Sequence, residues 1–268
     1  MKAFVNGAFV AASEASIGVW DRGLTLGDGV FDTLAIRGGE PCGFPEHWRR
    51  LADAARFFSI ELPFGSSELR RVVETLIAEN GVSEAVVRFT VTRGPGARGY
   101  APKGAGPTGL VVSLSPLPEP PAAKRLRVST FPVFSEDPLL RYKTLSRAIN
   151  VLAIQEAQSM GFDDALFLNE HSQFTEATSS NLFFLIDGVW RTPPLACGVL
   201  PGVTRAGVLE AGRWLGFPAV EGVVTPADLD RVTAVRLTNS VAGLVAVTEI
   251  VGDHTAHRFD KGPPRAST

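Results

Sequence analysis

The sequence has few of the residues that build a disulfide framework, a zinc site or a membrane span. It holds two cysteines and four histidines in 268 residues, so Cys42 and Cys197 are expected to be free, partly buried thiols, and no metal site is expected. No run approaches the roughly 18 apolar residues of a membrane span. The start, residues 1–7, turns polar too early for a signal peptide. Together these features predict a soluble protein of the cytoplasm.

An excess of charge of one sign is also missing. The formal net charge is −2, from 26 basic and 28 acidic residues, and both signs are spread along the chain. A basic face for nucleic acid is therefore not expected, nor is a membrane partner. The length and the 45% hydrophobic content suit one large domain or two modest ones.

Hydrophobic periodicity predicts alternating helices and strands, and therefore the α/β class. Apolar residues recur at helical spacing in some segments and alternate with polar residues in others. The expected helices cover 46–58, 67–78, 144–160 and a segment from about 204, and the expected strands cover 87–92, 110–114, 126–131, 165–168, 182–186 and 234–238.

A proline-rich stretch divides the chain into two expected domains. Four prolines fall within 116–121, and proline fits neither a helix interior nor a central strand. The sequence therefore predicts an N-terminal α/β domain at 1–116, a linker at 117–124 and a C-terminal domain at 125–268. An active site is expected in the cleft between them. The tail after Asp260 is expected to fray.

Lys143 is the first candidate functional residue. It lies between an irregular segment and the expected helix at 144–160. Most lysines are solvated surface residues, but an acidic motif downstream in the same half favours a chemical role. Pyridoxal phosphate (PLP) needs an amine that condenses with its aldehyde and then moves a proton. Burial and a cationic cofactor would lower the pKa of that amine.

Glu176 opens the acidic motif, and a glycine-bounded turn follows it. Small residues fill 177–180, so the backbone can approach a flat ring. A carboxylate beside the pyridine nitrogen keeps that nitrogen protonated and the ring an electron sink. Taken alone, the segment could equally be a capped turn. Further on, Gly202 precedes a helix whose N-terminus would offer N–H groups to a phosphate.

These motifs resemble the signature of the class IV aminotransferases, the fold-type IV PLP enzymes. The likeness rests on 176–183, Thr192 and 199–205, and it continues at 21–31, 47–51 and 237–240. It covers nearly the whole chain in the family's order. The resemblance implies a two-domain α+β protein with a smaller N-terminal α/β domain, a larger C-terminal domain and the site between them. It also implies a homodimer.

Carried over residue by residue, the resemblance assigns roles to specific side chains. Lys143 would bind PLP covalently, Glu176 would pair with the pyridine nitrogen, and Leu200 would pack on the ring. The phosphate would be held by Arg50, by the backbone of Val203 and Thr204, and by the hydroxyls of Thr204 and Ser240. A guanidinium such as that of Arg50 clamps a phosphate in bidentate fashion. His47 could support this site, although a structural role is expected.

The resemblance does not by itself choose the reaction, and three segments favour a lyase. Phe31 and Thr33 resemble the substrate segment of 4-amino-4-deoxychorismate lyase, in which the threonine is catalytic. The loop with Arg98 and Tyr100 resembles that enzyme's substrate loop, and 238–240 also resembles the lyase. The expected reaction converts 4-amino-4-deoxychorismate to 4-aminobenzoate and pyruvate, a step of folate biosynthesis. The alternative is a class IV aminotransferase acting on D-amino acids or (R)-amines with a 2-oxo acid acceptor.

Two readings from other classes are weaker. Residues 94–99 match the spacing of a dinucleotide-binding glycine motif and follow a strand, but 100–104 cannot open the helix that this motif requires. A non-catalytic binding module would be expected to lack Lys143 or Glu176, and both are present.

Overall fold

The computed structural model describes residues 1–253 and 255–259. Two compact units are present, and each is described by itself. Unit 1 comprises Met1–Pro118 together with Tyr142–Ser146, and unit 2 comprises Glu119–Arg141 together with the chain from Arg147 onward. None of the helices within the described residues is long and apolar enough to cross a membrane. The tail expected to fray lies outside the described residues.

Unit 1 is built on an antiparallel six-stranded sheet in the order β2-β1-β6-β5-β3-β4. Its strands are β1 Lys2–Val5, β2 Ala8–Ala11, β3 Gly29–Arg37, β4 Glu40–Pro41, β5 Ala85–Thr92 and β6 Gly109–Ser115, and its helices are α1 Arg22–Leu26, α2 Phe44–Phe57 and α3 Ser66–Asn80.

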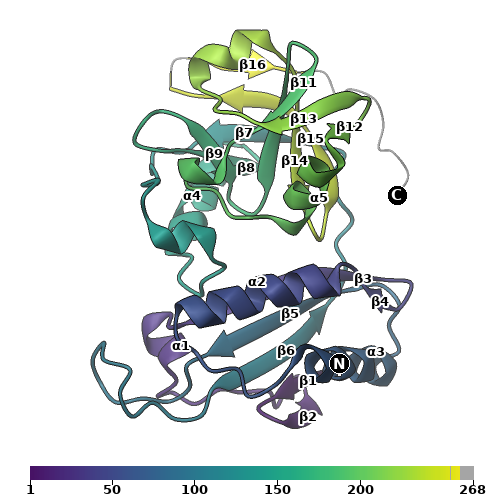
Figure 1. Ribbon diagram of the computed structural model, residues 1–268, viewed down its shortest axis with the longest axis vertical. Helices are drawn as coiled ribbons and strands as arrows, with labels where there is room; N and C mark the ends of the chain where they lie inside the picture. The colour runs from purple at the N-terminus through teal and green to yellow at the C-terminus, as the bar shows by residue number, and fades with distance from the viewer. Residues whose placement is uncertain (254, 260–268) are drawn as a thin grey trace. The chain divides into compact units, whose positions relative to one another are not determined.

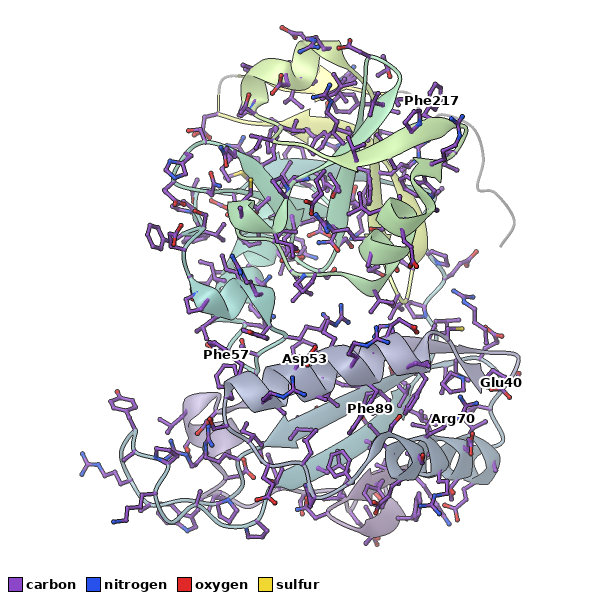
Figure 2. The ribbon with its side chains drawn as sticks, viewed as in Figure 1. Glu40, Asp53, Phe57, Arg70, Phe89 and Phe217 are labelled. Atoms are coloured by element: carbon purple, nitrogen blue, oxygen red, sulfur yellow. The ribbon has the colours of Figure 1, made fainter. Side chains whose placement is uncertain are left out.

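Strand alternation gives this sheet one apolar face and one mixed face. α2 and α3 pack on the apolar face (Figure 1), where Leu34 and Phe89 are fully buried. Figure 2 shows Phe89 on β5 beneath α2, and its ring meets that of Phe44 edge-on at 6.1 Å. The helices predicted at 46–58 and 67–78 are confirmed, because their apolar stripes are the surfaces that cover this face.

Unit 2 contains a larger mixed sheet, in the order β12-β13-β11-β10-β14-β15-β7-β8-β9 among the described residues. β9 pairs with both β8 and β10, so six strands from β10 to β9 close into a ring. Its core holds Leu166, Phe174, Phe184 and Val235, each fully buried. The strands are β7 Ala123–Val128, β8 Asp164–Leu168, β9 Phe174–Ala177, β10 Asn181–Ile186, β11 Val189–Thr192, β12 Arg213–Trp214, β13 Phe217–Glu221, β14 Val232–Asn239, β15 Gly243–Val251 and β16 Ala256–Arg258, which pairs with β15.

Unit 2 also carries two α-helices, α4 Ala148–Ser159 and α5 Val203–Ala211. Single 3-10 turns cover Pro138–Arg141, Leu195–Cys197 and Pro226–Arg231. The strands expected at 165–168, 182–186 and 234–238 and the helix expected from about 204 are confirmed. The strand expected at 126–131 begins earlier, at Ala123, and ends at Val128.

The expected start of the helix at residue 144 is wrong, because α4 begins only at Ala148. The preceding segment, Tyr142–Ser146, is instead bound to β3 of unit 1. The Phe31 amide donates to the Lys143 carbonyl at 2.8 Å, and the Leu145 amide donates to the Gly29 carbonyl at 3.0 Å. Because these backbone groups form hydrogen bonds with β3, they are not available for the hydrogen bonds of a helical turn. Thr144 pairs with Val30 as an antiparallel bridge.

Candidate active site

Lys143 is positioned by this extended segment. Successive side chains of an extended chain point to opposite sides, and two contacts follow that rule. The Tyr142 ring stacks on Phe57 of α2 with centroids 4.3 Å apart; Phe57 is labelled in Figure 2. The Lys143 ammonium Nζ lies 4.8 Å from the ring centroid of Phe31. Lys143 is half-buried, and the contact with Phe31 places its amine beside β3.

Phe31, Thr33 and Arg88 lie together on the mixed face of the unit 1 sheet, where the Lys143 amine contacts the Phe31 ring. Phe31 and Thr33 are half-buried and two residues apart on β3, so both side chains lie on the same face. Thr33 pairs with Arg88 across the strands. The Arg88 guanidinium carbon lies 3.7 Å from the Phe31 centroid, and Arg88 Nε donates to Thr90 Oγ1 at 3.3 Å.

Arg88 is a residue that the sequence analysis did not assign. The strand prediction places it on the polar side of 87–92, but only the β3–β5 register brings it opposite Thr33. A cation that packs on an aromatic ring is attracted by the ring's electrons. Arg88 therefore holds a positive charge beside Thr33, and a guanidinium suits a carboxylate.

Arg50 is oriented by a buried carboxylate on the opposite face of β3. Its Nε and Nη2 donate to the two carboxylate oxygens of Asp32 at 2.8 and 2.7 Å. His47 Nδ1 hydrogen-bonds Asp32 Oδ1 at 2.8 Å. Burial alone would raise the pKa of Asp32, but the hydrogen bonds from His47 and Arg50 lower that pKa from 3.8 to about 2. This bidentate pair fixes the guanidinium plane of Arg50, and His47 serves it by holding Asp32.

Glu176 is held in a similar way within unit 2. One of its carboxylate oxygens, Oε2, accepts from Asn181 Nδ2 at 3.0 Å and from the Leu200 amide at 3.1 Å. Asn181 Nδ2 also donates to the Leu200 carbonyl at 3.0 Å. Asn181 stands opposite Glu176 in the β9–β10 pairing. The β9–β10 pairing, which closes the strand ring, thus places the Glu176 carboxylate beside the turn that contains Leu200.

The N-terminus of α5 lies directly after this turn. Gly202 is the N-cap residue and no side chain caps the helix, so the first-turn amides of Val203 and Thr204 point out of the helix end. A side chain at position 202 would clash, because a Cβ there would lie 2.0 Å from Asn181 Oδ1. Glycine therefore permits the helix end and the Glu176 cluster to approach each other closely.

Ser240 follows β14 in a turn organised by Asn239. The side-chain oxygen of Asn239 accepts from the amides of Val241 and Ala242 at 3.0 and 2.7 Å, and its nitrogen donates to Ser180 Oγ at 2.9 Å. Ser180 belongs to the small-residue run after Glu176. The structure thus links the Ser240 turn to the acidic motif.

The donor set fits PLP chemically. Unit 2 supplies a carboxylate fixed by two donors, a helix end with outward amides and a hydroxyl-bearing turn, which suit a protonated ring nitrogen and a phosphate. Unit 1 supplies a half-buried amine at Lys143 and an oriented guanidinium at Arg50. Arg98 and Tyr100, which the sequence predicts to bind substrate, differ from these groups in burial. Both are exposed on the loop joining β5 to β6, and Tyr100 is 88% exposed.

The two cysteines do not contribute to these groups as a pair. Both are free, as expected; Cys42 is exposed and Cys197 is buried. The expectation that each is partly buried is therefore wrong in both directions, because Cys42 follows an edge strand while Cys197 packs in the turn before Gly198. Cys197 Sγ contacts Gln173 Oε1 at 3.1 Å.

Comparison with known proteins decides the family. The family model of amino-transferase class IV matches residues 29–250. The chain belongs to this family. Its members use PLP, so the expectation of a PLP-dependent enzyme is confirmed.

Individual relatives carry different activities. A Methanocaldococcus jannaschii protein provisionally named a branched-chain-amino-acid aminotransferase is 32% identical, over 94% of this chain and 88% of its own. A D-alanine aminotransferase of Listeria monocytogenes is 30% identical, over 96% and 90%. The crystal structure of 4-amino-4-deoxychorismate lyase from Pseudomonas aeruginosa is 33% identical and aligns with a TM-score of 0.83 over 97% of this chain and 94% of its own. The fold-type IV architecture is confirmed, whereas the relatives span both reactions.

Proposed function

We propose that this class IV enzyme is a lyase that converts 4-amino-4-deoxychorismate to 4-aminobenzoate and pyruvate. The observation that carries the proposal is the arrangement on β3. The Lys143 amine lies 4.8 Å from the Phe31 ring, and Thr33 follows on the same face of the strand. A base and a hydroxyl on one face are the two groups that an elimination needs.

We propose that PLP is held by the residues whose geometry was described above. Lys143 would bind it covalently, Glu176 would pair with the ring nitrogen and Leu200 would pack on the ring. The phosphate would be bound by Arg50, by the amides of Val203 and Thr204, and by the hydroxyls of Thr204 and Ser240. When bound, PLP supplies an electron sink for negative charge that develops on the substrate.

The chain's own residues would then move two protons. The Lys143 amine removes the proton from the substrate carbon that bears the amine. The bond to the enolpyruvyl oxygen breaks, and the Thr33 hydroxyl, or Lys143 itself, returns a proton to the leaving group, which departs as pyruvate. The remaining ring becomes aromatic, which makes the step strongly downhill, so positioning is the main requirement.

Substrate recognition would rest on cations and aromatic rings. We propose that Arg98 or Arg88 binds a carboxylate of the substrate, while Phe31 and Tyr100 contact its ring. Arg88 is fixed on Phe31 at 3.7 Å and therefore offers its charge without a large loss of side-chain freedom.

A second candidate is an aminotransferase that acts on D-amino acids or (R)-amines with a 2-oxo acid. The 30% identity to a D-alanine aminotransferase favours it. The same Lys143 would serve, but the amine would stay on the cofactor and pass to the 2-oxo acid. A lone carboxylate of such a substrate would also suit Arg88 or Arg98.

One assay pair separates the two candidates. Purified holoenzyme is supplied with 4-amino-4-deoxychorismate while 4-aminobenzoate and pyruvate are followed, and separately with D-alanine and 2-oxoglutarate. The lyase proposal expects turnover in the first assay. Turnover in the second assay alone would refute it and establish the aminotransferase.

The family resemblance also implies a homodimer, and we propose that the enzyme works as one in the cytosol. Sedimentation equilibrium of the holoenzyme should give twice the mass of the 28.6 kDa chain. A single-chain mass at assay concentration would contradict this proposal.

A further inference from the structure

Arg22 of α1 reaches into the loop that carries Arg98 and Tyr100. Its Nη1 donates to the Gly99 carbonyl at 3.0 Å and to the Ala101 carbonyl at 3.4 Å, and its Nη2 donates to the Tyr100 carbonyl at 2.9 Å. Three successive backbone carbonyls are thus bound by one guanidinium. The Arg22 side chain is only 4% exposed, although the side chains of the loop itself point to solvent.

The Nε end of the Arg22 guanidinium is fixed by an ion pair with Asp28 that is largely buried. Its Nε donates to Asp28 Oδ2 at 2.8 Å, and Arg93 donates to the same carboxylate through Nε and Nη2 at 2.8 and 3.0 Å. Burial would raise the pKa of Asp28, but hydrogen bonds from Arg93 and Arg22 lower it. Arg93 also donates to the carbonyls of Phe58 and Ser59. The two arginines therefore share Asp28, but Arg93 binds the segment after α2 whereas Arg22 binds residues 99–101.

The start of the loop lies in direct contact with Arg22. The Arg22 amide donates to the Gly94 carbonyl at 2.9 Å, and the Gly96 amide donates to the Trp20 carbonyl at 3.1 Å. A Cβ at position 96 would lie 2.7 Å from Arg22 Cδ. Backbone and side chain of Arg22 therefore hold the loop at two places, before and after Arg98.

The same site lies next to the lysine segment. Asp28 precedes Gly29, whose carbonyl accepts the Leu145 amide at 3.0 Å. A Cβ on Gly29 would lie 2.7 Å from Leu145 Cδ1. Arg22, through Asp28, is thus built into the turn against which the Lys143 segment packs.

We propose that Arg22 is a positioning residue for substrate recognition, which presents Arg98 and Tyr100 in one orientation by holding the carbonyls of residues 99–101. The inference rests on the proposed function only in assigning Arg98 and Tyr100 to the substrate. An exposed loop would otherwise lose its conformational freedom when substrate binds, at a cost in affinity. A lysine at position 22 keeps the charge but is a point donor that cannot span three carbonyls.

The test compares Arg22→Lys with Arg93→Lys, the matched arginine on Asp28. For Arg22→Lys we expect KM for the carboxylate substrate to rise about tenfold, as for the loss of one or two charge-assisted hydrogen bonds, with kcat and PLP affinity nearly unchanged. Arg93→Lys should leave KM unchanged. An equal rise in both variants, or none in Arg22→Lys, would overturn the inference.

A double-mutant cycle asks whether Arg22 acts through Arg98. In an Arg98→Ala background, Arg22→Lys should raise KM by less than it does in the wild type, because one of the two side chains that Arg22 positions is gone. Fully additive effects on KM would show that Arg22 does not act through Arg98.

Amide hydrogen exchange over residues 97–104 gives a readout that needs no substrate. The holoenzyme should exchange faster there in Arg22→Lys than in wild type or Arg93→Lys. Absence of turnover in every assay would reject the proposed function alone, whereas unchanged exchange would reject the role of Arg22 alone.

Gly96→Ala perturbs the same contact while keeping Arg22, and it covers the case in which Arg22→Lys does not fold. The added methyl must displace the Arg22 side chain, so we expect the same faster exchange and the same rise in KM. Gly18→Ala, where a Cβ meets nothing within 4 Å, is the control. Identical behaviour of the two glycine variants would contradict the proposal.

Discussion

At the scale of single residues, the chain fixes its candidate functional groups with buried partners. Asp32 is fully buried and bonded to both His47 and Arg50, while Glu176 is bonded to Asn181 and a backbone amide. In each case the carboxylate is committed to one orientation before any ligand binds. Such preorganisation reduces the cost of binding and catalysis.

Asp32 predicts a specific dependence of stability on pH. Its folded-state pKa of about 2 lies below the ordinary 3.8. Ionised Asp32 therefore stabilises the fold above pH 3.8, and this contribution, about 2 kcal/mol, is lost as pH falls towards 2. Urea unfolding should show Asp32→Asn to be less stable than wild type at pH 7, with the difference narrowing between pH 4 and pH 2.

Asp53 is the matched control for Asp32. Asp53 belongs to α2, where Figure 2 labels it. Half of its side chain is exposed, and it forms an ion pair with Arg56. Asp53→Asn should change the unfolding free energy by less than about 0.5 kcal/mol. A difference between Asp32→Asn and wild type that stays constant from pH 7 to pH 2 would contradict the assignment.

Thr33 predicts a kinetic effect. Thr33→Val keeps the shape of the side chain but removes the hydroxyl, so we expect kcat of the lyase reaction to fall about 10²-fold, with PLP absorbance unchanged. Thr90 of β5 lies on the same face of the sheet, opposite Phe31. Thr90→Val should reduce kcat far less. Full activity in Thr33→Val would mean that Lys143 moves both protons.

Sequence reasoning found most of these residues but not their partners. Lys143, Glu176 and Arg50 stand in recognisable motifs, and all three lie within the residues that the family model matches. Asp32, the partner of Arg50, and Arg88, the partner of Thr33, are placed by strand register and by the packing of α2 on β3. No local pattern encodes these contacts, because they join segments distant in sequence.

At the scale of elements, apolar periodicity identified most helices and strands, and it failed where tertiary pairing competes. The segment before α4 has residues suited to a helix, yet its backbone bonds to β3. Likewise, the β9–β10 pairing that closes the strand ring of unit 2 is invisible to periodicity. Non-local hydrogen bonds decided both features.

The helix end at Gly202 predicts an effect on cofactor binding. Gly202→Ala would push a methyl into Asn181 Oδ1 and disturb the cluster that holds Glu176. We expect the apparent Kd for PLP, measured by absorbance titration, to rise about ten- to hundredfold, since one to two buried charge-assisted hydrogen bonds are strained.

Gly207 in the same helix offers the control. A Cβ there meets nothing within 4 Å, and alanine favours a helix interior by up to about 1 kcal/mol. Gly207→Ala should therefore bind PLP normally and unfold at the same or a higher urea concentration. Weaker PLP binding in Gly207→Ala than in Gly202→Ala would refute the role given to the helix end.

At the scale of the whole molecule, the chain passes from unit 1 to unit 2 and returns briefly at Tyr142–Ser146. That return places Lys143 beside β3 of unit 1, whereas Glu176 and the end of α5 belong to unit 2. We propose that Lys143, Glu176 and the end of α5 act on one PLP molecule.

Borohydride reduction of the PLP-loaded enzyme, followed by peptide mass spectrometry, is the decisive experiment for this proposal. Reduction makes the bond between PLP and its lysine permanent, so the mass label marks the residue that held it. We expect a pyridoxyl label on Lys143 alone, lost in Lys143→Ala and weakened in Glu176→Gln and Gly202→Ala at limiting PLP. A label on Lys103 or Lys124, or no stable label at all, would contradict it.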